Sequence, residues 1–533
     1  LRVLFLAGLF DGVEKKFKGS VDSKPHRKLA RESAAQGIVL LKNRRNALPL
    51  DMKKIKTLAV LGPNAAVMRL GGGGSSSVLP YYSVSPLEGI RKKCGSKVAV
   101  HFSEGCVMPG DLMPVDAAHL VPPEGHGAEH GLWGEYFNNM NLEGQPVLTW
   151  IDDKVDFNWG EGSPAAQVPC DHFSARWTGK LVPSVSGKYQ LGMTSDDGFR
   201  LFLDGKMIID SWIDQAGITT TVPLDLVAGQ SYDLRAEYFE NVGGALARLG
   251  WVTPRDILDE GIRIAEKADA AVVFAGSMWQ FEGEGTDRDN IDLPGLQSEL
   301  IQAVAKVNPN TVVVLVNGTP LVMGEWIEQV SAVVEAWYPG QEGGNAIADV
   351  LFGDVNPSGK LTVSFPKSLS DVSCVGNYPG KDGVVRYEEG IFVGYRHYDT
   401  RGIEPLFPFG HGLSYTRFTY GRMGVKHSRS AAGNKVDVTV EIKNTGKCKG
   451  AEVVQLYVRD VESSVERPVK ELKGFNKVVL KPGEKKSLRF SLDESAFSFY
   501  DPEKKGWVTE PGVFEIMLGS SSRDIRLKKR LKL

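Results

Sequence analysis

Continuous apolar runs of strand length recur in two separate parts of this chain, and amphipathic segments lie between them. Such runs predict strands that are buried on both faces of a parallel sheet covered by helices. The predicted strands are Thr57–Leu61, Val98–Phe102, Ala270–Ala275, Thr311–Val316, Ala332–Trp337 and Leu361–Phe365. The predicted helices are Lys24–Asn43, a segment beginning at Pro254, Leu296–Val304 and Glu342–Leu351. This alternation of strands and helices indicates an α/β domain.

The stretch between the two α/β parts has a different pattern. Residues 108–130 are rich in Pro, Gly and His, which predicts a linker. Over residues 131–251 apolar and polar positions alternate, and Asp204–Gly205 has the composition of a hairpin turn. A β-sandwich at 131–251 is therefore expected to interrupt the α/β domain, whose halves, 25–130 and 252–415, must meet in space.

After residue 415 the pattern is purely β. Apolar residues alternate along Val436–Ile442 and Leu488–Leu492, and strands spaced about ten residues apart are typical of a sandwich. Residues 416–533 are therefore predicted to form a second all-β domain. The predicted fold class is multidomain α/β plus all-β, with an α/β sandwich domain interrupted by one β-sandwich and followed by another.

Composition excludes several classes of protein. The chain has 533 residues, which suggests several domains, and its net charge is −2. A nucleic-acid-binding protein would carry a basic domain or stripe, so we expect no nucleic-acid partner. No apolar run reaches the length of a membrane span, so we expect no membrane partner either.

The cysteines indicate neither a disulfide framework nor a zinc site. Their number is odd, they are scattered over separate predicted domains, and no CxxC motif occurs. A Cys94–Cys106 pair stays open, but reduced thiols are preferred. The apolar amino terminus lacks the basic flank and the cleavage site of a signal peptide. The compartment stays open, with the cytoplasm preferred to secretion.

The polar loop Phe281–Pro294 is the main candidate for chemistry. It directly follows the predicted buried strand Ala270–Ala275, and open α/β sheets bind ligands at the carboxyl ends of their strands. The loop carries Glu282, Glu284 and an Asp287–Arg288 pair. Glycines on both sides of Glu284 permit backbone conformations that push its carboxyl group outward. On the residues alone, a site loop and a solvated acidic loop are both open.

The tract Gly71–Ser77 invites comparison with a phosphate-binding loop. It lacks the Gly-Lys-Ser/Thr ending of a P-loop and the Gly-x-Gly-x-x-Gly spacing that opens a helix. A nucleotide-binding α/β protein is therefore disfavoured, and no cofactor is expected. We interpret the tract as a mobile loop beside the pocket. His397 and His411 have no partner at metal-ligand spacing, so no metal site is expected.

Five stretches resemble, in the same order, motifs of glycoside hydrolase family 3, the β-glucosidase family. Glu282–Arg288 followed by Asn290–Gln297 is similar to the acid/base loop of that family. The other stretches are Leu40–Asn43 with Leu48–Leu50, Gly62–Ala65 with Gly71–Gly74, Trp337–Ala346 through Asn356–Leu361, and Pro408–Tyr415. The resemblance covers nearly the whole chain.

The resemblance implies a retaining glycosidase, which needs a nucleophilic carboxylate and an acid/base carboxyl group about 5 Å apart. Glu284 matches the acid/base position of the family. Asp287 and Arg288 are expected to form an ion pair that fixes the loop. Glu282 is expected to face solvent rather than to raise the proton affinity of Glu284.

The family's nucleophile is an Asp in a Ser-Asp-Trp phrase on a (β/α)₈ barrel that precedes the regions seen here. This phrase does not occur in the chain, and Asp210–Trp212 has the wrong order. We therefore expect residues 1–24 to be a linker from a barrel that the chain does not contain. The barrel, on another chain or a missing portion, is the expected partner, and a homo-oligomer stays open.

The two all-β segments carry resemblances of their own. The inserted segment resembles the protective-antigen-type β-sandwich through Tyr136–Phe137, Thr194–Phe199 and Ala236–Tyr238. The tail at 416–533 resembles, through Glu452–Val458 and Arg467–Phe475, the fibronectin type III-like domain of the same hydrolases.

Within the inserted sandwich, Trp212 and Trp159 are candidates to stack on a sugar face and bind substrate. Asp196–Asp197 resembles the calcium-binding pair of adhesins with the same sandwich. Two carboxylates alone do not fill a calcium coordination shell, and a simple turn is the preferred interpretation.

The predicted function is release of terminal non-reducing β-D-glucosyl residues from short oligosaccharides or glucosides, with this chain supplying Glu284 and the outer subsite. The alternative is a non-catalytic carbohydrate-binding or adhesin-like protein, favoured by the two sandwiches and the missing nucleophile. Against it, a pure binder has no need of the Glu284 loop. The terminal sugar and its linkage stay open.

Overall fold

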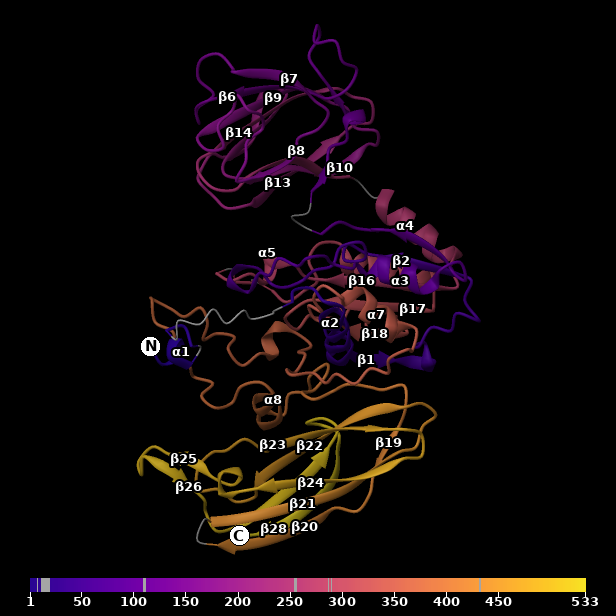
Figure 1. The fold of residues 1–533 in the computed structure, drawn as a ribbon, viewed down its shortest axis with the longest axis vertical. Coiled ribbons are helices and arrows are strands. Elements are labelled where there is room, and N and C mark those ends of the chain that lie inside the picture. Colours follow the sequence, from indigo (N-terminus) through magenta and orange to yellow (C-terminus); the bar gives the residue numbers. More distant parts are fainter. Residues whose placement is uncertain are drawn as a thin grey trace.

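An α/β domain lies in the middle of the molecule, with one β-sandwich above it and a second below it (Figure 1). The computed structural model describes residues 1–6, 8–10, 20–108, 112–253, 256–285, 287–288, 290–430 and 433–533. The predicted fold class, multidomain α/β plus all-β, is confirmed.

A mostly parallel sheet forms the centre of the α/β domain. Its strands are β1 (Val39–Asn43), β2 (Thr57–Leu61), β3 (Ala99–Ser103), β16 (Ala270–Gly276), β17 (Thr311–Val316) and β18 (Ala332–Glu335). Their order is β1-β18-β17-β16-β2-β3, and only the β1–β18 pair among these described strands is antiparallel. Every residue of β16 and β17 is buried, because helices cover both faces of the sheet.

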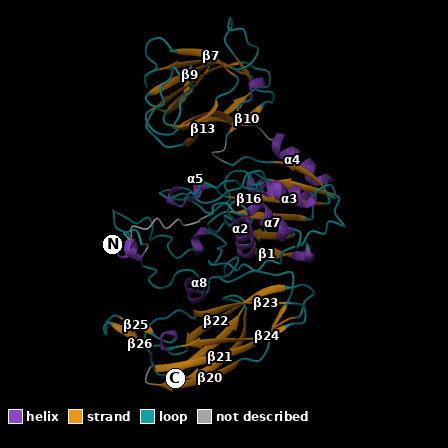
Figure 2. Cartoon of the chain, in the orientation of Figure 1, coloured by secondary structure: helices purple, strands orange, loops and turns teal. Residues whose placement is uncertain are grey.

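Helices lie on both faces of this sheet (Figure 2). One face packs against α2 (Lys24–Gly37), α3 (Pro86–Cys94) and α7 (Gly343–Leu351). The other packs against α4 (Asp256–Lys267) and α6 (Gln297–Val307). The remaining helices are α1 (Arg2–Leu6), α5 (Trp279–Glu282) and α8 (Tyr395–Arg401). Local sequence sets their ends; α3, for example, begins with a capping box between Ser85 and Glu88.

Two elements of this domain differ from the prediction. A helix was predicted for Lys24–Asn43, but the observed helix α2 ends at Gly37. The last five residues of the predicted segment, Val39–Asn43, form strand β1 instead. A short apolar run has no periodicity that separates a strand from a helix, so pairing with β18 decides the outcome. The strand predicted at Leu361–Phe365 makes, within the described ranges, an isolated bridge from Phe365 to Phe407.

The inserted β-sandwich leaves the α/β domain after β3 and returns at α4. Its strands are β4 (Met113–Pro114), β5 (Leu120–Val121), β6 (Leu132–Phe137), β7 (Leu148–Asp152), β8 (Asp156–Gly160), β9 (Phe173–Leu181), β10 (Gly187–Asp196), β11 (Phe199–Leu203), β12 (Lys206–Ser211), β13 (Ile218–Leu226), β14 (Tyr232–Glu240) and β15 (Ala245–Val252). One sheet has the order β13-β10-β15-β4 and the other β12-β11-β14-β9-β6-β7, with an aromatic core between them. The predicted turn at Asp204–Gly205 joins β11 to β12.

The linker predicted for residues 108–130 is partly wrong. β4 pairs with β15 and β5 pairs with β9, and Val115 and Leu120 are buried in the sandwich core. Two-residue strands are too short to show an alternating pattern, so only their partners reveal them. Residues 109–111 of the predicted linker lie outside the described residues.

The C-terminal domain is a second sandwich. Its strands are β19 (Phe418–Tyr420), β20 (Gly424–Ser430), β21 (Gly433–Asn444), β22 (Gly450–Asp460), β23 (Glu471–Leu480), β24 (Lys485–Leu492), β25 (Phe499–Asp501), β26 (Gly506–Val508), β27 (Val513–Gly519) and β28 (Ile525–Lys532). β24 and β20 pair with β21 in one sheet, and the other has the order β23-β22-β27-β28. Buried and solvated residues alternate along β21, as expected for a sheet with one face on the core.

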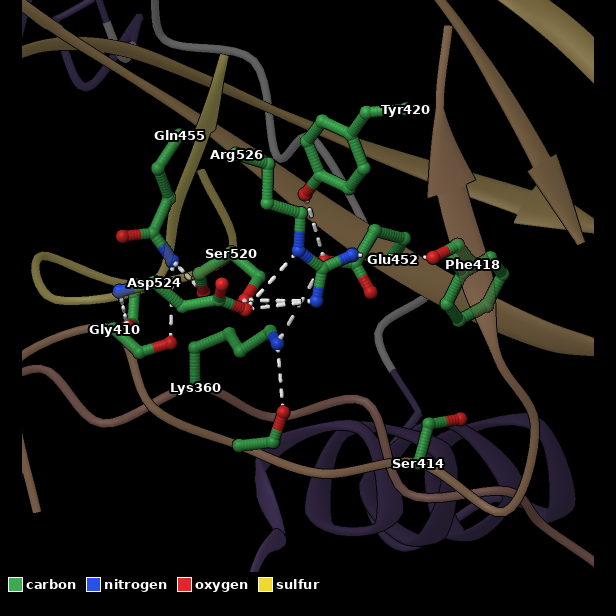
Figure 3. A network of polar contacts seen from close by, with 12 residues as sticks. Lys360, Gly410, Ser414, Phe418, Tyr420, Glu452, Gln455, Ser520, Asp524 and Arg526 are labelled. Atoms are coloured by element: carbon green, nitrogen blue, oxygen red, sulfur yellow. Dashed lines mark hydrogen bonds and ion pairs between the residues drawn. The ribbon is translucent and has the colours of Figure 1, made fainter. Parts of the chain in front are cut away.

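A buried polar network joins the C-terminal sandwich to the α/β domain (Figure 3). Nζ of Lys360 donates to the carbonyl oxygen of Gly412 at 2.7 Å and lies 3.9 Å from the carboxylate of Glu452. Oη of Tyr420 donates to the same carboxylate at 3.0 Å. Burial lowers the pKa of Lys360. Each charge has lost most of its water, so each depends on the other for stabilisation.

The five cysteines are free thiols, which confirms the preferred prediction. Within the described ranges, no helix combines the length and the apolar character needed to span a bilayer.

Candidate active site

The loop that carries Glu284 follows β16 at the carboxyl edge of the sheet. From β2 the chain continues to β3 on one side, whereas from β16 it continues to β17 on the other. The strand order therefore reverses between these two neighbours, and open α/β sheets bind ligands at such a point. The loops that start here are residues 62–78 after β2 and residues 277–285 after β16.

Glycines allow these two loops to lie against each other. A Cβ atom on Gly73 would lie 3.0 Å from Cβ of Trp279, and one on Gly74 would lie 2.3 Å from Cβ of Glu284. Gly74 also has a φ of +69°, which disfavours any side chain. The glycine tract thus packs directly on the Glu284 loop, in agreement with its predicted place beside the pocket.

Glu284 is exposed, and Ser75 holds its carboxylate. The backbone N–H of Ser75 donates to Oε2 of Glu284 at 2.6 Å, and the hydroxyl group of Ser75 donates to the same atom. These hydrogen bonds hold the pKa of Glu284 below its usual value, because they stabilise the charged form. The chain therefore presents Glu284 as a carboxylate that can accept a proton.

Glu282 does not face solvent, which corrects the expectation from the sequence. Its side chain is 2% exposed. Its carboxylate accepts hydrogen bonds from the backbone N–H of Gly318 at 2.7 Å and from that of Thr319 at 3.3 Å. Oη of Tyr338 donates to it as well. Glu282 and Glu284 lie in the same loop, but one points into the domain and the other out of it.

The expected Asp287–Arg288 ion pair is also corrected. Arg288 lies with Nη1 3.4 Å from Oε1 of Glu282 and donates to the carbonyl oxygen of Asp292 at 2.9 Å. Asp287 is exposed and accepts a hydrogen bond from Oη of Tyr378 at 3.0 Å. Arg288 therefore does fix the loop, but through a different carboxylate. Thr286 and Asp289 of the predicted loop lie outside the described residues.

A cavity of about 470 Å³ borders on the glycine tract, with Trp279 on its wall. Its other lining residues are Val67, Met68, Arg69, Leu70, Gly71, Gly73, Gly74, Ser77 and Val78. Neither Trp279, which is 46% exposed, nor Ser75 was predicted. An aromatic residue just after the buried-strand pattern was a signal for Trp279. No local signal links Ser75 to Glu284, since 209 residues separate them.

The two tryptophans predicted to stack on a sugar have different surroundings. Trp159 is half-buried and stacks on Phe157 with ring centroids 4.9 Å apart, so it packs against the sandwich core. Trp212 is half-buried between Arg200, whose guanidinium carbon lies 4.0 Å from the ring centroid, and Phe239. The position of Trp159 does not support a binding role, whereas Trp212 retains a partly open ring.

The Asp196–Asp197 pair has structural partners. Oδ1 of Asp197 accepts from the backbone N–H of Gln215 at 2.9 Å, and Oδ2 accepts from that of Asn241 at 2.8 Å. Over the part of the chain that the structure describes, no group of three or more His, Cys, Asp or Glu could hold a metal ion.

Comparison with known families supports the sequence resemblance. Residues 38–415 match the glycosyl hydrolase family 3 C-terminal domain, and residues 452–522 match the fibronectin type III-like domain. A β-glucosidase of Rhizobium radiobacter is 38% identical over 100% of this chain and 66% of its own length. Thermostable β-glucosidase B of Acetivibrio thermocellus is 52% identical over 52% of this chain and 37% of its own length.

Solved structures agree with these sequence relatives. A β-glucosidase from Kluyveromyces marxianus in complex with glucose is 36% identical, with a TM-score of 0.74, over 96% of this chain and 62% of that one. DesR, a β-glucosidase from Streptomyces venezuelae in complex with D-glucose, is 32% identical, with a TM-score of 0.74, over 100% of this chain and 63% of that one. The chain thus spans less than two thirds of the length of these relatives.

Proposed function

This chain belongs to glycoside hydrolase family 3, and we propose that it supplies the acid/base half of a retaining β-glucosidase. The observation that carries the proposal is the exposed carboxylate of Glu284, which Ser75 holds at the point where the strand order reverses. The proposed substrates are β-D-glucosides and short oligosaccharides, from which the terminal non-reducing glucosyl residue is released. The β-glucosidase relatives support this choice of substrate class.

Retaining hydrolysis has two steps. In the first, a nucleophilic carboxylate attacks the anomeric carbon while the acid/base group protonates the glycosidic oxygen, and the leaving group departs as an alcohol. In the second, the same group, now ionised, takes a proton from the water that attacks the glycosyl–enzyme ester. Glucose is released and both carboxyl groups return to their starting state. We assign the acid/base role in both steps to Glu284.

We propose that the nucleophile belongs to a (β/α)₈ barrel domain outside these 533 residues. The absence of a Ser-Asp-Trp phrase from the sequence and the greater length of the relatives support this assignment. A second carboxylate about 5 Å away and the loss of water on docking would both raise the pKa of Glu284. They would oppose the hydrogen bonds of Ser75, which lower it, so that Glu284 could carry the proton that the first step needs.

The test is Glu284→Gly in the complete enzyme that contains this chain. The kcat/KM for alkyl glucosides, which reports the first step, should fall about 10²–10⁴-fold because their leaving groups need a proton, whereas kcat/KM for activated aryl glucosides should change far less. The kcat for activated aryl glucosides should fall because the second step has lost its base. Azide should restore this kcat and yield β-glucosyl azide, since a small anion needs no general base. Glu266→Gln, on the exposed side of α4, is the matched control.

Two outcomes would contradict the assignment. Azide rescue in Glu282→Gly but not in Glu284→Gly would exchange the roles of the two glutamates. Unchanged hydrolysis after Glu284→Gly would favour the alternative, a non-catalytic carbohydrate-binding role for this chain.

A further inference from the structure

Glu284 lies on a segment that the backbone alone would leave loose, because Gly283 and Gly285 flank it. The nearest fixed point before it is Glu282, whose carboxylate is almost completely buried. A buried carboxylate is costly unless donors surround it. Here the donors come from several parts of the chain, which gives Glu282 a role beyond filling space.

The carboxylate of Glu282 joins three loops at the carboxyl edge of the sheet. Glu282 itself ends α5, after β16. Gly318 and Thr319, which donate through their backbone N–H groups, follow β17. Tyr338, which donates through its hydroxyl group, follows β18. One side chain thus ties together the ends of three adjacent parallel strands.

The same carboxylate also anchors the loop beyond Glu284. Arg288 lies 3.4 Å from it and donates to Oγ1 of Thr319 at 3.0 Å. A Cβ atom on Gly318 would lie 2.9 Å from the ring of Tyr338 and 3.2 Å from Oε2 of Glu282, so the contact is close-packed. Glu284 therefore stands between two residues, Glu282 and Arg288, that are held by one another and by the sheet.

We propose that Glu282 is the positioning residue for Glu284: it makes no contact with substrate itself and holds the backbone of the acid/base loop at the reversal point of the sheet. The inference rests on the proposed acid/base function of Glu284. A catalytic group loses rate steeply when it is displaced by about 1 Å. A carboxylate suits the task because every partner is a donor. A glutamine would turn an N–H group toward at least one of those donors.

The experiment is Glu282→Gln in the complete enzyme, with kcat/KM measured on an alkyl glucoside and on a dinitrophenyl glucoside. This ratio reports the first chemical step, in which only the alkyl leaving group needs the proton from a well-placed Glu284. It should fall about 10–100-fold for the alkyl glucoside and less than threefold for the dinitrophenyl glucoside. Tyr338→Phe removes one donor and should give a smaller loss with the same selectivity. Glu266→Gln should change neither rate.

A double variant separates positioning from a general structural role. Glu282→Gln combined with Glu284→Gly should be no slower on the alkyl glucoside than Glu284→Gly alone, since the group to be positioned is already absent. The proposal would be overturned if the rate losses of Glu282→Gln and Glu284→Gly multiplied in the double variant. It would also be overturned if Glu282→Gln slowed both substrates equally. Should Glu282→Gln fail to fold, the selectivity of Tyr338→Phe decides in the same way.

The two proposals can fail separately. If Glu284→Gly slowed the hydrolysis of alkyl and activated aryl glucosides equally, the acid/base function would be refuted. Selectivity in Glu284→Gly but not in Glu282→Gln or Tyr338→Phe would refute only the positioning role.

Discussion

The surroundings of a carboxyl group, rather than its residue type alone, set its pKa in this protein, as Glu284 and Glu240 show. Ser75 lowers the pKa of the exposed Glu284. Burial, aided by nearby Asp197 and Asp196, raises the pKa of Glu240 to about 7, although a hydrogen bond from Tyr238 opposes this rise. Both glutamates accept hydrogen bonds, but Glu284 is solvated whereas Glu240 is fully buried, and this difference in burial gives Glu240 the higher proton affinity.

Glu240 should make the stability of the inserted sandwich depend on pH. Its folded pKa, about 7, lies above its usual value of 4.5. The folded state therefore binds the proton more tightly than the unfolded state. The stability that this proton contributes is complete below about pH 4.5 and is lost as the pH rises through 7.

Chemical unfolding of wild type and Glu240→Gln at pH 5 and pH 8 tests this. The wild type should lose up to about 2 kcal/mol more of its free energy of unfolding between the two pH values than the variant. Each pH unit that separates the folded from the unfolded pKa contributes at most about 1.4 kcal/mol, and residual solvation reduces this value. Glu266→Gln should follow the wild type. An identical pH dependence in wild type and Glu240→Gln would mean that another group titrates.

Trp212 allows a test of the proposed outer subsite. In the complete enzyme, Trp212→Ala should raise KM for disaccharides about fivefold, the value of one stacking contact of about 1 kcal/mol, and leave inhibition by glucose unchanged. Trp507, which is 73% exposed on the C-terminal sandwich, offers the control Trp507→Ala. Equal weakening of both ligands would assign Trp212 to packing with Arg200 and Phe239.

At the scale of elements, the site depends on how closely two loops approach. The loop after β2 lies on the loop after β16 because Gly73 and Gly74 have no side chains where Trp279 and Glu284 pass. Parallel strands bring their carboxyl ends to one edge of a sheet, so such meetings follow from the topology. The glycine tract is thus part of the surface that shapes the site.

Gly74→Ala should therefore damage catalysis without unfolding the domain. The new Cβ atom would lie 2.3 Å from Cβ of Glu284, and the residue would keep an unfavourable φ of +69°. We expect kcat on alkyl glucosides to fall tenfold or more, since about 1 Å of displacement suffices for such a loss. The matched control is Gly71→Ala, whose Cβ would meet its nearest atom at 4.0 Å. Comparable kcat values for the two variants would show that the loop can move aside at no cost to the site.

At the scale of the whole molecule, the three bodies are joined in different ways. Two chain segments connect the inserted sandwich to the α/β domain, one after β3 and one before α4 (Figure 1). The C-terminal sandwich shares the buried Lys360–Glu452 network with the α/β domain. Its Gln455 also donates to the carbonyl oxygen of Gly410 at 3.2 Å. We therefore expect the C-terminal sandwich and the α/β domain to unfold together.

Lys360→Met should lower the free energy of unfolding by about 2–4 kcal/mol, because it removes the buried cation that lies 3.9 Å from the carboxylate of Glu452. Adding Glu452→Gln should recover part of that loss, since the carboxylate that lost the charge of Lys360 is then neutral. Denaturant unfolding of the single and double variants measures both. If Glu452→Gln lowered the free energy of unfolding by the same amount in Lys360→Met as in the wild type, the two groups would not be coupled.

The proposed division of the active site also belongs to this scale. The 533-residue chain alone should not turn over aryl β-glucosides, because a general acid by itself contributes only about 10²–10⁴-fold. Purified chain is assayed with and without the remainder of the complete enzyme. Efficient hydrolysis by the chain, with no barrel polypeptide detectable by mass spectrometry, would overturn the division.

Local pattern and motif spacing were sufficient for much of this protein. The buried runs Ala270–Ala275 and Thr311–Val316 are strands because helices on both faces exclude polar residues from them. Gly285 after Glu284 and Gly205 in the turn at Asp204–Gly205 have φ values of +80° and +74°, so both use the backbone freedom of glycine. Such features depend on neighbours in sequence, and so the fold class could be predicted. Glu284 was predicted as the acid/base residue from the resemblance of its loop to glycoside hydrolase family 3.

Other features were decided only by contacts between distant residues. The direction of Glu282 depends on Gly318, Thr319 and Tyr338, which reach it through the order of the parallel strands. Glu282 and Glu284 are two residues apart in the sequence, and this spacing does not predict which of the two carboxylates points into the domain. The partner of Arg288, the hold of Ser75 on Glu284 and the strand β1 have the same origin. The sequence by itself determined where strands, turns and the acidic loop lie, because those depend on local periodicity and backbone freedom. The tertiary structure alone decided which side chains of that loop are buried, paired or exposed, because burial and pairing depend on segments far apart in the chain.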